Sequence, residues 1–185
     1  MNSESQSILF SAGRNDECMT PRYVVEAIVP YLSKNKVYWC PFDHADSAFV
    51  DVLRESGREV VFSHIAEGQD FFDYEPERWD VLLSNPPFTS KSRILERTLS
   101  FGKPFGLLMP LTWLMDAAPK LLYGDRQMQL FLFIDRVRFL YPNGRQMDDK
   151  VTFGSGFYCW DLLPESLIVS DVRRPGTIGG RFVVR

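Results

Sequence analysis

Hydrophobic and polar positions along the chain form a regular succession of short apolar runs separated by polar and turn-forming residues. Continuous apolar runs of this length, bounded by Pro, Gly, Asn or Asp, are typical of buried strands. We predict strands at residues 37–40, 60–62, 80–84, 105–109, 130–134 and 156–162, with 181–185 as a further edge strand.

Between these runs lie segments with the periodicity or the end signals of amphipathic helices. In the first, Thr20 can serve as N-cap and Pro21 suits the first helical position. In the second, Asp46 or Ser47 caps the start and Gly57 closes the end. Further helices are predicted at 91–99 and 117–123. Alternating strands and helices with short links predict an α/β protein with a mostly parallel sheet covered on both faces.

Composition narrows the class of protein. The chain has 185 residues, of which 45% are apolar, so it has the length and the core material of one domain. We expect residues 1–15 to be a flexible arm and 16–185 a single domain. A formal charge of −3 argues against binding polyanions over the whole surface. With 3 Cys and 2 His widely spaced, no metal site is expected. Neither a signal peptide nor a membrane span is visible, so we expect a cytoplasmic protein.

The densest chemical signal follows the strand predicted at 80–84, where the sequence reads Asn85-Pro86-Pro87-Phe88. Ligand crevices in open α/β sheets form beyond the carboxyl ends of the strands. Two consecutive prolines fix two φ angles and remove two N–H donors, which leaves a rigid loop of bare carbonyls. Asn85 adds a side-chain acceptor and Phe88 a flat apolar face. An amino group on a planar ring needs acceptors for its hydrogens and a stacking partner for the ring. The alternative interpretation of Pro-Pro after a strand is a stiff structural turn.

Other short features precede this loop. Along the chain they are Thr20-Pro21 before the first strand, Pro41-Phe42-Asp43 at its end, Ser63-His64 after the second strand, and then Asp70-Phe71. This succession resembles the class I N6-adenine methyltransferases that use S-adenosylmethionine, in particular small phage-type adenine methylases. Those enzymes carry a TP segment, a DPF turn, a DF pair and a (D/N/S)PP(Y/F/W) loop in the same order. The resemblance covers residues 20 to 163, nearly the whole predicted core.

The resemblance implies a Rossmann-like class I methyltransferase fold, with a mostly parallel sheet and an antiparallel C-terminal hairpin. It also implies transfer of a methyl group from S-adenosylmethionine to the N6 amino group of adenine in DNA. Asn85 and the carbonyl of Pro86 would accept hydrogen bonds from that amino group, in a loop that Pro87 completes. Phe88 would stack on an adenine flipped out of its helix.

The same resemblance assigns residues to the cofactor. Asp70 would bind the amino group of the cofactor's adenine, with Phe71 against that ring, and Asp43 could hold the ammonium of the methionine end. His64 could donate or accept one hydrogen bond at the ribose. The full set is Thr20, Pro21, Phe42, Asp43, His64, Asp70 and Phe71.

Two features depart from the family pattern. The turn at 40–47 lacks the glycines that allow a backbone to approach the cofactor closely. The acidic residue expected after the second strand, which would bind both ribose hydroxyls, is replaced by Ser63 and His64. Asp70 and Thr20 also suit purely local roles, as a turn cap and a helix cap.

Basic residues near the predicted site are candidates for binding the substrate. Lys91, Arg93 and Arg97 follow the Asn-Pro-Pro loop within one predicted helix. Arg145 lies in a segment at 141–156 that we predict to form a hairpin over the pocket, tipped by Asn143-Gly144. Further candidates are Arg136, Arg138, Arg173, Arg174, Arg181 and Arg185. Ordinary solvated charge is an equally good interpretation of any single one. No separate target-recognition domain fits the chain, so we expect loose sequence specificity, or a specificity-supplying partner or homodimer.

Two other functions remain open at this stage. The same loop serves an RNA adenine or a protein glutamine, because an amide nitrogen also presents two hydrogens on a planar group. The altered turn and the missing acid instead favour a catalytically degenerate module of the same fold that binds nucleic acid or a partner.

Overall fold

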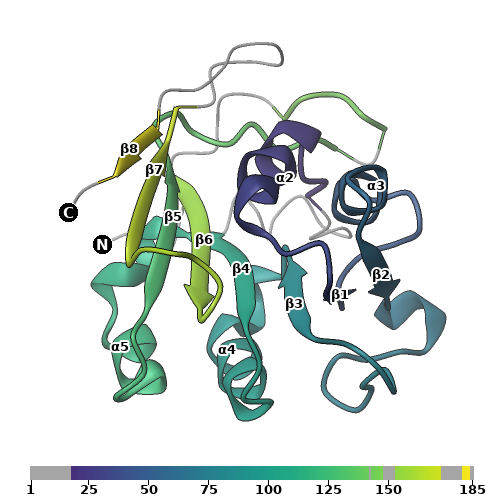
Figure 1. Ribbon diagram of the computed structural model, residues 1–185, viewed down its shortest axis with the longest axis horizontal. Helices are drawn as coiled ribbons and strands as arrows, with labels where there is room; N and C mark the ends of the chain where they lie inside the picture. The colour runs from purple at the N-terminus through teal and green to yellow at the C-terminus, as the bar shows by residue number, and fades with distance from the viewer. Residues whose placement is uncertain (1–17, 142, 148–152, 172–180, 184–185) are drawn as a thin grey trace.

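The computed structural model describes residues 18–141, 143–147, 153–171 and 181–183. Eight strands of this part form one sheet in the order β2-β1-β3-β4-β6-β5-β7-β8 (Figure 1). The strands are β1 (Val37–Cys40), β2 (Glu59–Phe62), β3 (Val81–Ser84), β4 (Phe105–Pro110), β5 (Gln129–Phe133), β6 (Ser155–Trp160), β7 (Leu167–Ser170) and β8 (Arg181–Val183). Strands β6 and β8 run antiparallel to their neighbours, and the other pairs are parallel.

This topology confirms the predicted fold class. Strand β6 lies between β4 and β5 and pairs antiparallel with both, so the antiparallel C-terminal pair was placed correctly. The prediction missed β7, a strand of four residues that pairs with β5 and β8 near the end of the sheet. The predicted edge strand after residue 180 is present as β8, which pairs with β7 at the end of the sheet.

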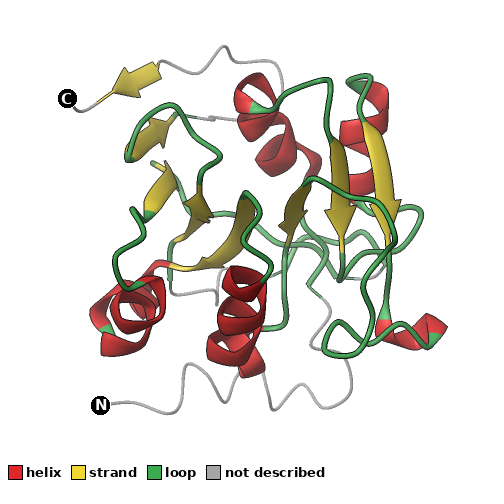
Figure 2. Cartoon of the chain, turned by 60° about the horizontal axis from the view of Figure 1, so that its bottom comes forward, coloured by secondary structure: helices red, strands yellow, loops and turns green. Residues whose placement is uncertain are grey.

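Helices lie on both sides of the sheet (Figure 2). They are α2 (Arg22–Ile28), α3 (Ala48–Glu55), α4 (Lys91–Ser100) and α5 (Ala117–Tyr123). Side chains on successive positions of a strand point to opposite faces. Accordingly Tyr38 and Leu83 join the core under α2 and α3, whereas Trp39 and Leu82 join the core under α4 and α5. None of the described helices has the length and apolar character that a membrane span requires.

The observed ends of α2 and α3 test the predicted capping residues. Ser47 is the N-cap of α3, because its Oγ accepts a hydrogen bond from the Val50 N–H at 3.3 Å. Gly57 follows the C-cap with φ +78°, a conformation that glycine adopts without strain. The predicted N-cap role of Thr20 is wrong: Pro21 occupies that position, and no side chain caps α2.

The sheet brings the loops that follow β1, β2 and β3 to one edge. These three strands are adjacent and parallel, so their carboxyl ends point the same way. The loops begin at Pro41, Ser63 and Asn85, where the sequence places its chemistry. The predicted arm at 1–15 lies outside the described residues, as do Arg173, Arg174, Arg185 and residues 148–152 of the predicted hairpin.

Candidate functional site

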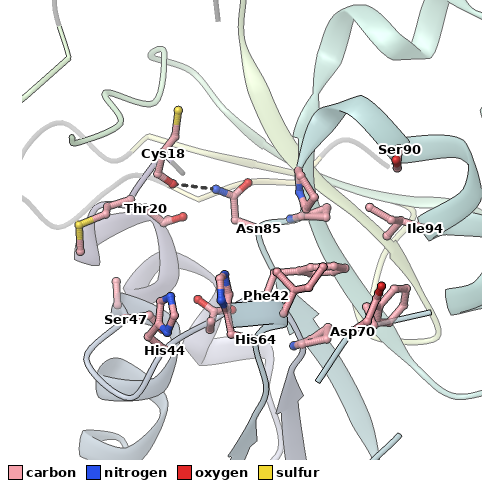
Figure 3. Close-up of a pocket in the computed structure, with 18 of the residues that line it drawn as sticks. Cys18, Thr20, Phe42, His44, Ser47, His64, Asp70, Asn85, Ser90 and Ile94 are labelled. Carbon is pink, nitrogen blue, oxygen red and sulfur yellow. Dashed lines mark hydrogen bonds between the residues drawn. The ribbon is translucent and has the colours of Figure 1, made fainter. Parts of the chain in front are cut away.

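A pocket of about 590 Å³ opens at the carboxyl ends of β1, β2 and β3. Its volume falls within the range of about 300–1,000 Å³ that is usual for small-molecule sites. The loops after these strands supply most of its wall, and the segment 18–20 closes one side. Figure 3 shows Asn85 across the pocket from His64, Phe42 and Asp70. The lining residues are Cys18, Met19, Thr20, Pro41, Phe42, Asp43, His44, Asp46, Ser47, Ala48, His64, Ile65, Asp70, Phe71, Phe72, Asn85, Pro86, Pro87, Ser90 and Ile94.

The side-chain amide of Asn85 has a defined orientation. Its Nδ2 donates a hydrogen bond to the Cys18 carbonyl at 3.2 Å, which identifies the nitrogen end of the amide (Figure 3). The other end, Oδ1, is buried and accepts no hydrogen bond from any part of the chain that the structure describes. A buried acceptor without a donor costs about 1–3 kcal/mol, so native proteins rarely keep one without a reason. Asn85 therefore carries an acceptor that a ligand N–H would satisfy.

Pro86 and Pro87 hold this acceptor in place. Both lie in the pocket wall, and Pro87 is extended, with φ −63° and ψ 131°, before the short turn η3 (Phe88–Ser90). Pro86 is buried and Pro87 half-buried, so the loop is packed as well as conformationally restricted. The fixed φ angles of two prolines leave the loop little freedom to move away from a ligand.

Asp43 places a buried carboxylate in the pocket wall at the end of β1. Its Oδ2 accepts a hydrogen bond from the Ser84 hydroxyl, and Ser47 bonds the carboxylate as well. No lysine or arginine of the described chain forms an ion pair with it. Burial raises the pKa of Asp43 to about 6, although the hydroxyl bonds and His44 act in the opposite direction. A cationic ligand group would neutralise this carboxylate.

His64 occupies the position after β2 where the family has an acid. Its Nδ1 accepts the Ala66 N–H at 3.1 Å, so in the neutral ring the proton is on Nε2. The ring packs against that of His44, with centroids 3.8 Å apart and the planes tilted by 41°, and His44 Nδ1 lies 3.6 Å from Glu67 Oε1. The preceding Ser63 is buried and its hydroxyl accepts the Trp39 indole N–H, so it faces the core. His64 therefore places an imidazole, held by the Ala66 N–H, where an acidic side chain was expected.

Asp70 and its aromatic neighbours form another part of the wall. Asp70 Oδ1 accepts the Phe72 N–H at 2.9 Å, so the carboxylate caps its own turn while lining the pocket. The Phe71 ring is only 3% exposed and contacts Trp39 and Phe42. Phe42 is half-buried, which makes it the better placed of these rings for stacking on a planar ligand.

Five of the predicted site residues lie outside the pocket wall. Pro21 is buried at the start of α2, and the ring of Phe88 contacts Phe153, with centroids 6.1 Å apart. Lys91 lies against Trp113 and Asp116. Arg93 is exposed over the ring of Phe72, and Arg145 is exposed over the ring of Tyr141. The remaining predicted residues all line the pocket, namely Thr20, Phe42, Asp43, His64, Asp70, Phe71, Asn85, Pro86 and Pro87.

The sequence analysis missed Cys18, Met19 and His44 as pocket residues. His44 stands in the turn at 40–47, and its position next to Asp43 was the available signal. The contact between Cys18 and Asn85 spans 67 positions, so no local pattern could reveal it. Among the described residues, no group of three or more His, Cys, Asp or Glu side chains is arranged to hold a metal ion.

Comparison with known proteins gives a likeness of fold. No protein-family model and no curated protein sequence matches the chain. The methyltransferase subunit of a type I restriction-modification system from Streptococcus thermophilus has a TM-score of 0.50 and 10% identity, over 90% of this chain and 50% of that one. The chain thus spans about half of that protein's length. An Agrobacterium tumefaciens protein described as a predicted O-methyltransferase has a TM-score of 0.47 and 11% identity, over 86% of this chain and 90% of that one. The chain has the Rossmann-like fold of methyltransferases.

Proposed function

We propose that the chain transfers a methyl group from S-adenosylmethionine to the N6 amino group of adenine in DNA. The observation that carries this proposal is the Asn85 amide, whose Oδ1 is a buried acceptor without a donor at the edge of the pocket. A carbonyl of this kind suits an amino group, which brings the missing N–H. The type I restriction-modification neighbour is consistent with this assignment.

The pocket residues fit the cofactor. S-adenosylmethionine carries an ammonium group and an adenine, and it supplies a methyl group bonded to a cationic sulfur. Asp43 presents a buried carboxylate with no lysine or arginine partner among the described residues, which suits the ammonium. Asp70 and Phe42 lie together in the wall and suit an amino-bearing ring. His64 Nε2–H is a donor for a ribose oxygen.

The loop residues would position the amino group for attack. In this scheme Asn85 Oδ1 accepts one hydrogen of the amino group and the Pro86 carbonyl accepts the other. Two acceptors on one side pull the nitrogen towards tetrahedral geometry and direct its lone pair away from the loop. Such a reaction needs no strong general base, because positioning and charge complementarity lower its barrier. The rigidity of Pro86-Pro87 makes the positioning effective.

Replacement of Asn85 tests the assignment. We expect Asn85→Ala to lower methyl transfer by roughly 100-fold or more, the usual loss when one transition-state hydrogen bond is removed. Cofactor affinity should stay within about twofold of the wild-type value, because Asn85 contacts the acceptor and not the donor. The measurement is transfer of tritium from labelled S-adenosylmethionine into DNA, with cofactor binding followed by calorimetry.

The matched control is Asn35→Ala, at an exposed asparagine in the loop before β1. Its transfer rate should equal that of the wild type. Unchanged turnover in Asn85→Ala would refute the catalytic role of the loop. Label that appears in RNA or in protein but never in DNA would leave that role standing and overturn the DNA assignment.

A further inference from the structure

The segment that follows β5 folds back on itself as a short ribbon, which we call the arginine ribbon and define as residues 135–141 and 143–147. The Met147 N–H bonds the Phe139 carbonyl at 2.9 Å, and the Tyr141 N–H bonds the Arg145 carbonyl at 2.8 Å. Gly144, at the tip, has φ +76°. Residue 142 lies outside the described part. The ribbon is therefore a hairpin with its turn at the predicted Asn143-Gly144.

Alternate residues of the ribbon face the core and the solvent. Val137 and Phe139 are each 2% exposed and belong to the core that contains α2, whereas Arg136 and Arg138 between them are exposed. The Arg138 N–H donates to the Tyr23 hydroxyl of α2 at 3.0 Å. In Figure 1 this green segment passes beside α2. The two guanidinium groups thus project from a backbone that is held in place.

The ribbon borders the pocket on the side of Asn85. Leu140 and Met19 form an antiparallel pair in which each N–H bonds the other's carbonyl at 2.9 Å. Met19 lines the pocket, and the carbonyl of the adjacent Cys18 accepts the Asn85 amide. Only the segment 18–20 therefore separates the ribbon from the acceptor amide.

Two arginines of the ribbon, Arg136 and Arg138, differ from the other exposed arginines in their contacts within the described chain. Elsewhere, Arg22 pairs with glutamates, Arg78 pairs with Glu59, and Arg126 lies over the ring of Trp160. Within the described chain, Arg136 and Arg138 have neither an ion pair nor a ring contact, and Arg145 lies over the ring of Tyr141 at 5.4 Å. In a protein of net charge −3, exposed guanidinium groups without an ion pair among the described residues favour an anionic partner.

We propose that the arginine ribbon binds the phosphates of the polynucleotide that carries the target adenine. This inference rests on the proposed function and adds the surface that holds the acceptor. Guanidinium groups bind phosphate oxygens through a planar, bidentate fork, and such contacts fix the position of a strand without reading its sequence. Arg136, Arg138 and Arg145 then hold the backbone while the base enters beside Asn85. Loose sequence specificity follows from this arrangement.

Salt-dependent binding tests the ribbon. The probe is a fluorescein-labelled oligonucleotide, as duplex DNA, single-stranded DNA and RNA of one sequence, followed by anisotropy between 50 and 200 mM salt. On duplex DNA, each phosphate contact contributes about −0.9 to the slope of the logarithm of the binding constant against the logarithm of the salt concentration. The slope of R136A/R138A should therefore be less steep than that of the wild type by about 2. We expect a loss of affinity of roughly 10- to 100-fold at the lowest salt. The charge-matched control R78A/R126A, at exposed arginines away from the pocket wall, should bind like the wild type.

The outcomes separate this inference from the proposed function. Equal affinity and equal slope for R136A/R138A and the wild type would overturn the ribbon as a phosphate-binding surface. Absence of binding to all three probes by the wild type would overturn it as well. Calorimetry with S-adenosylmethionine on the same samples tests independently whether the protein binds the cofactor. Binding of RNA alone, with the same loss in the variant, supports the ribbon and moves the acceptor from DNA to RNA.

Discussion

At the scale of single residues, two buried polar groups in the pocket lack the partner that would satisfy them. Asn85 Oδ1 has no donor, and the Asp43 carboxylate has hydroxyl donors but no cation among the described residues. The buried Asn85 Oδ1 costs free energy because a hydrogen bond is not made, and the Asp43 carboxylate costs free energy because a charge is buried. Both deficits would be relieved by one ligand pair, a cationic methyl donor and an amino acceptor.

Asp43 gives the site a pH dependence. Its pKa is raised by burial to about 6, so the carboxylate is ionised at pH 7.5 and largely protonated at pH 5. An ammonium group needs the ionised form, and we expect the dissociation constant of S-adenosylmethionine to rise about tenfold between these pH values. Calorimetry at both pH values measures this change. In Asp43→Asn, binding should be weak at both pH values and lack this tenfold change.

Asp43→Asn should also change the stability of the fold: it should weaken cofactor binding but stabilise the protein. Because the pKa of Asp43 is higher in the folded state, its burial costs free energy above pH 6, and this cost disappears as the pH falls below the unfolded pKa near 4. Asp43→Asn should therefore raise the free energy of unfolding at pH 7.5 by about 1–3 kcal/mol and have little effect at pH 4. Denaturant unfolding at the two pH values measures this. A variant that binds cofactor as tightly as the wild type at pH 7.5 would contradict the assignment.

At the scale of elements, Arg58 joins the beginning of β2 to the end of the first helical segment. It is 7% exposed, and its Nη2 donates to the carbonyls of Val29 and Leu32, at the end of η1 (Val29–Tyr31), which continues α2. Helix ends leave carbonyls without intrahelical donors, and a cation there is favourable. One buried guanidinium thus anchors the helix that follows Thr20-Pro21 to the sheet.

Removal of this guanidinium should destabilise the protein. We expect Arg58→Met to lower the free energy of unfolding by about 2–4 kcal/mol, because two buried carbonyls lose charged donors while the apolar stem is kept. The control Arg78→Met replaces an exposed arginine that pairs with Glu59, and its effect should stay within about 0.5 kcal/mol. Chemical denaturation measures both variants. Equal effects of the two substitutions would show that Arg58 has no structural role of its own.

Elements with strong local signals were predicted closely. The bounds of β1 and α5 agree with the prediction, and Ser47 and Gly57 start and end α3 as expected. Thr20 failed as a cap because the chain remains extended through Pro21, where φ is −65° and ψ 144°, so the helix begins one residue later. Strand β7 was missed because it pairs with β5, and no local sequence signal indicates that pairing.

The site was partly predictable for a topological reason. Loops that follow adjacent parallel strands converge at one edge, so Asp43, His64 and Asn85 could be grouped from sequence order alone. The contact between the rings of His44 and His64 and the hydrogen bond from Asn85 to Cys18 are tertiary contacts, and no spacing in the sequence predicts them.

At the scale of the whole molecule, the two halves of the sheet carry the two parts of the proposed site. Strands β1, β2 and β3 build the pocket, whereas the connection from β5 to β6 supplies the arginine ribbon at its rim. The chain spans about half of the restriction-modification methyltransferase subunit that shares its fold. In the present proposal, the pocket and the ribbon supply the donor and acceptor sites of one reaction.

The central claim is that this pocket binds S-adenosylmethionine, and calorimetric titration of the wild-type protein tests it most directly. We predict saturable binding of one cofactor per chain, with a dissociation constant between about 1 µM and 1 mM, the usual range for enzyme substrates. Asn85→Ala should give the same curve and Asp43→Asn a much weaker one. Absence of heat with millimolar cofactor at pH 7.5 would contradict the account.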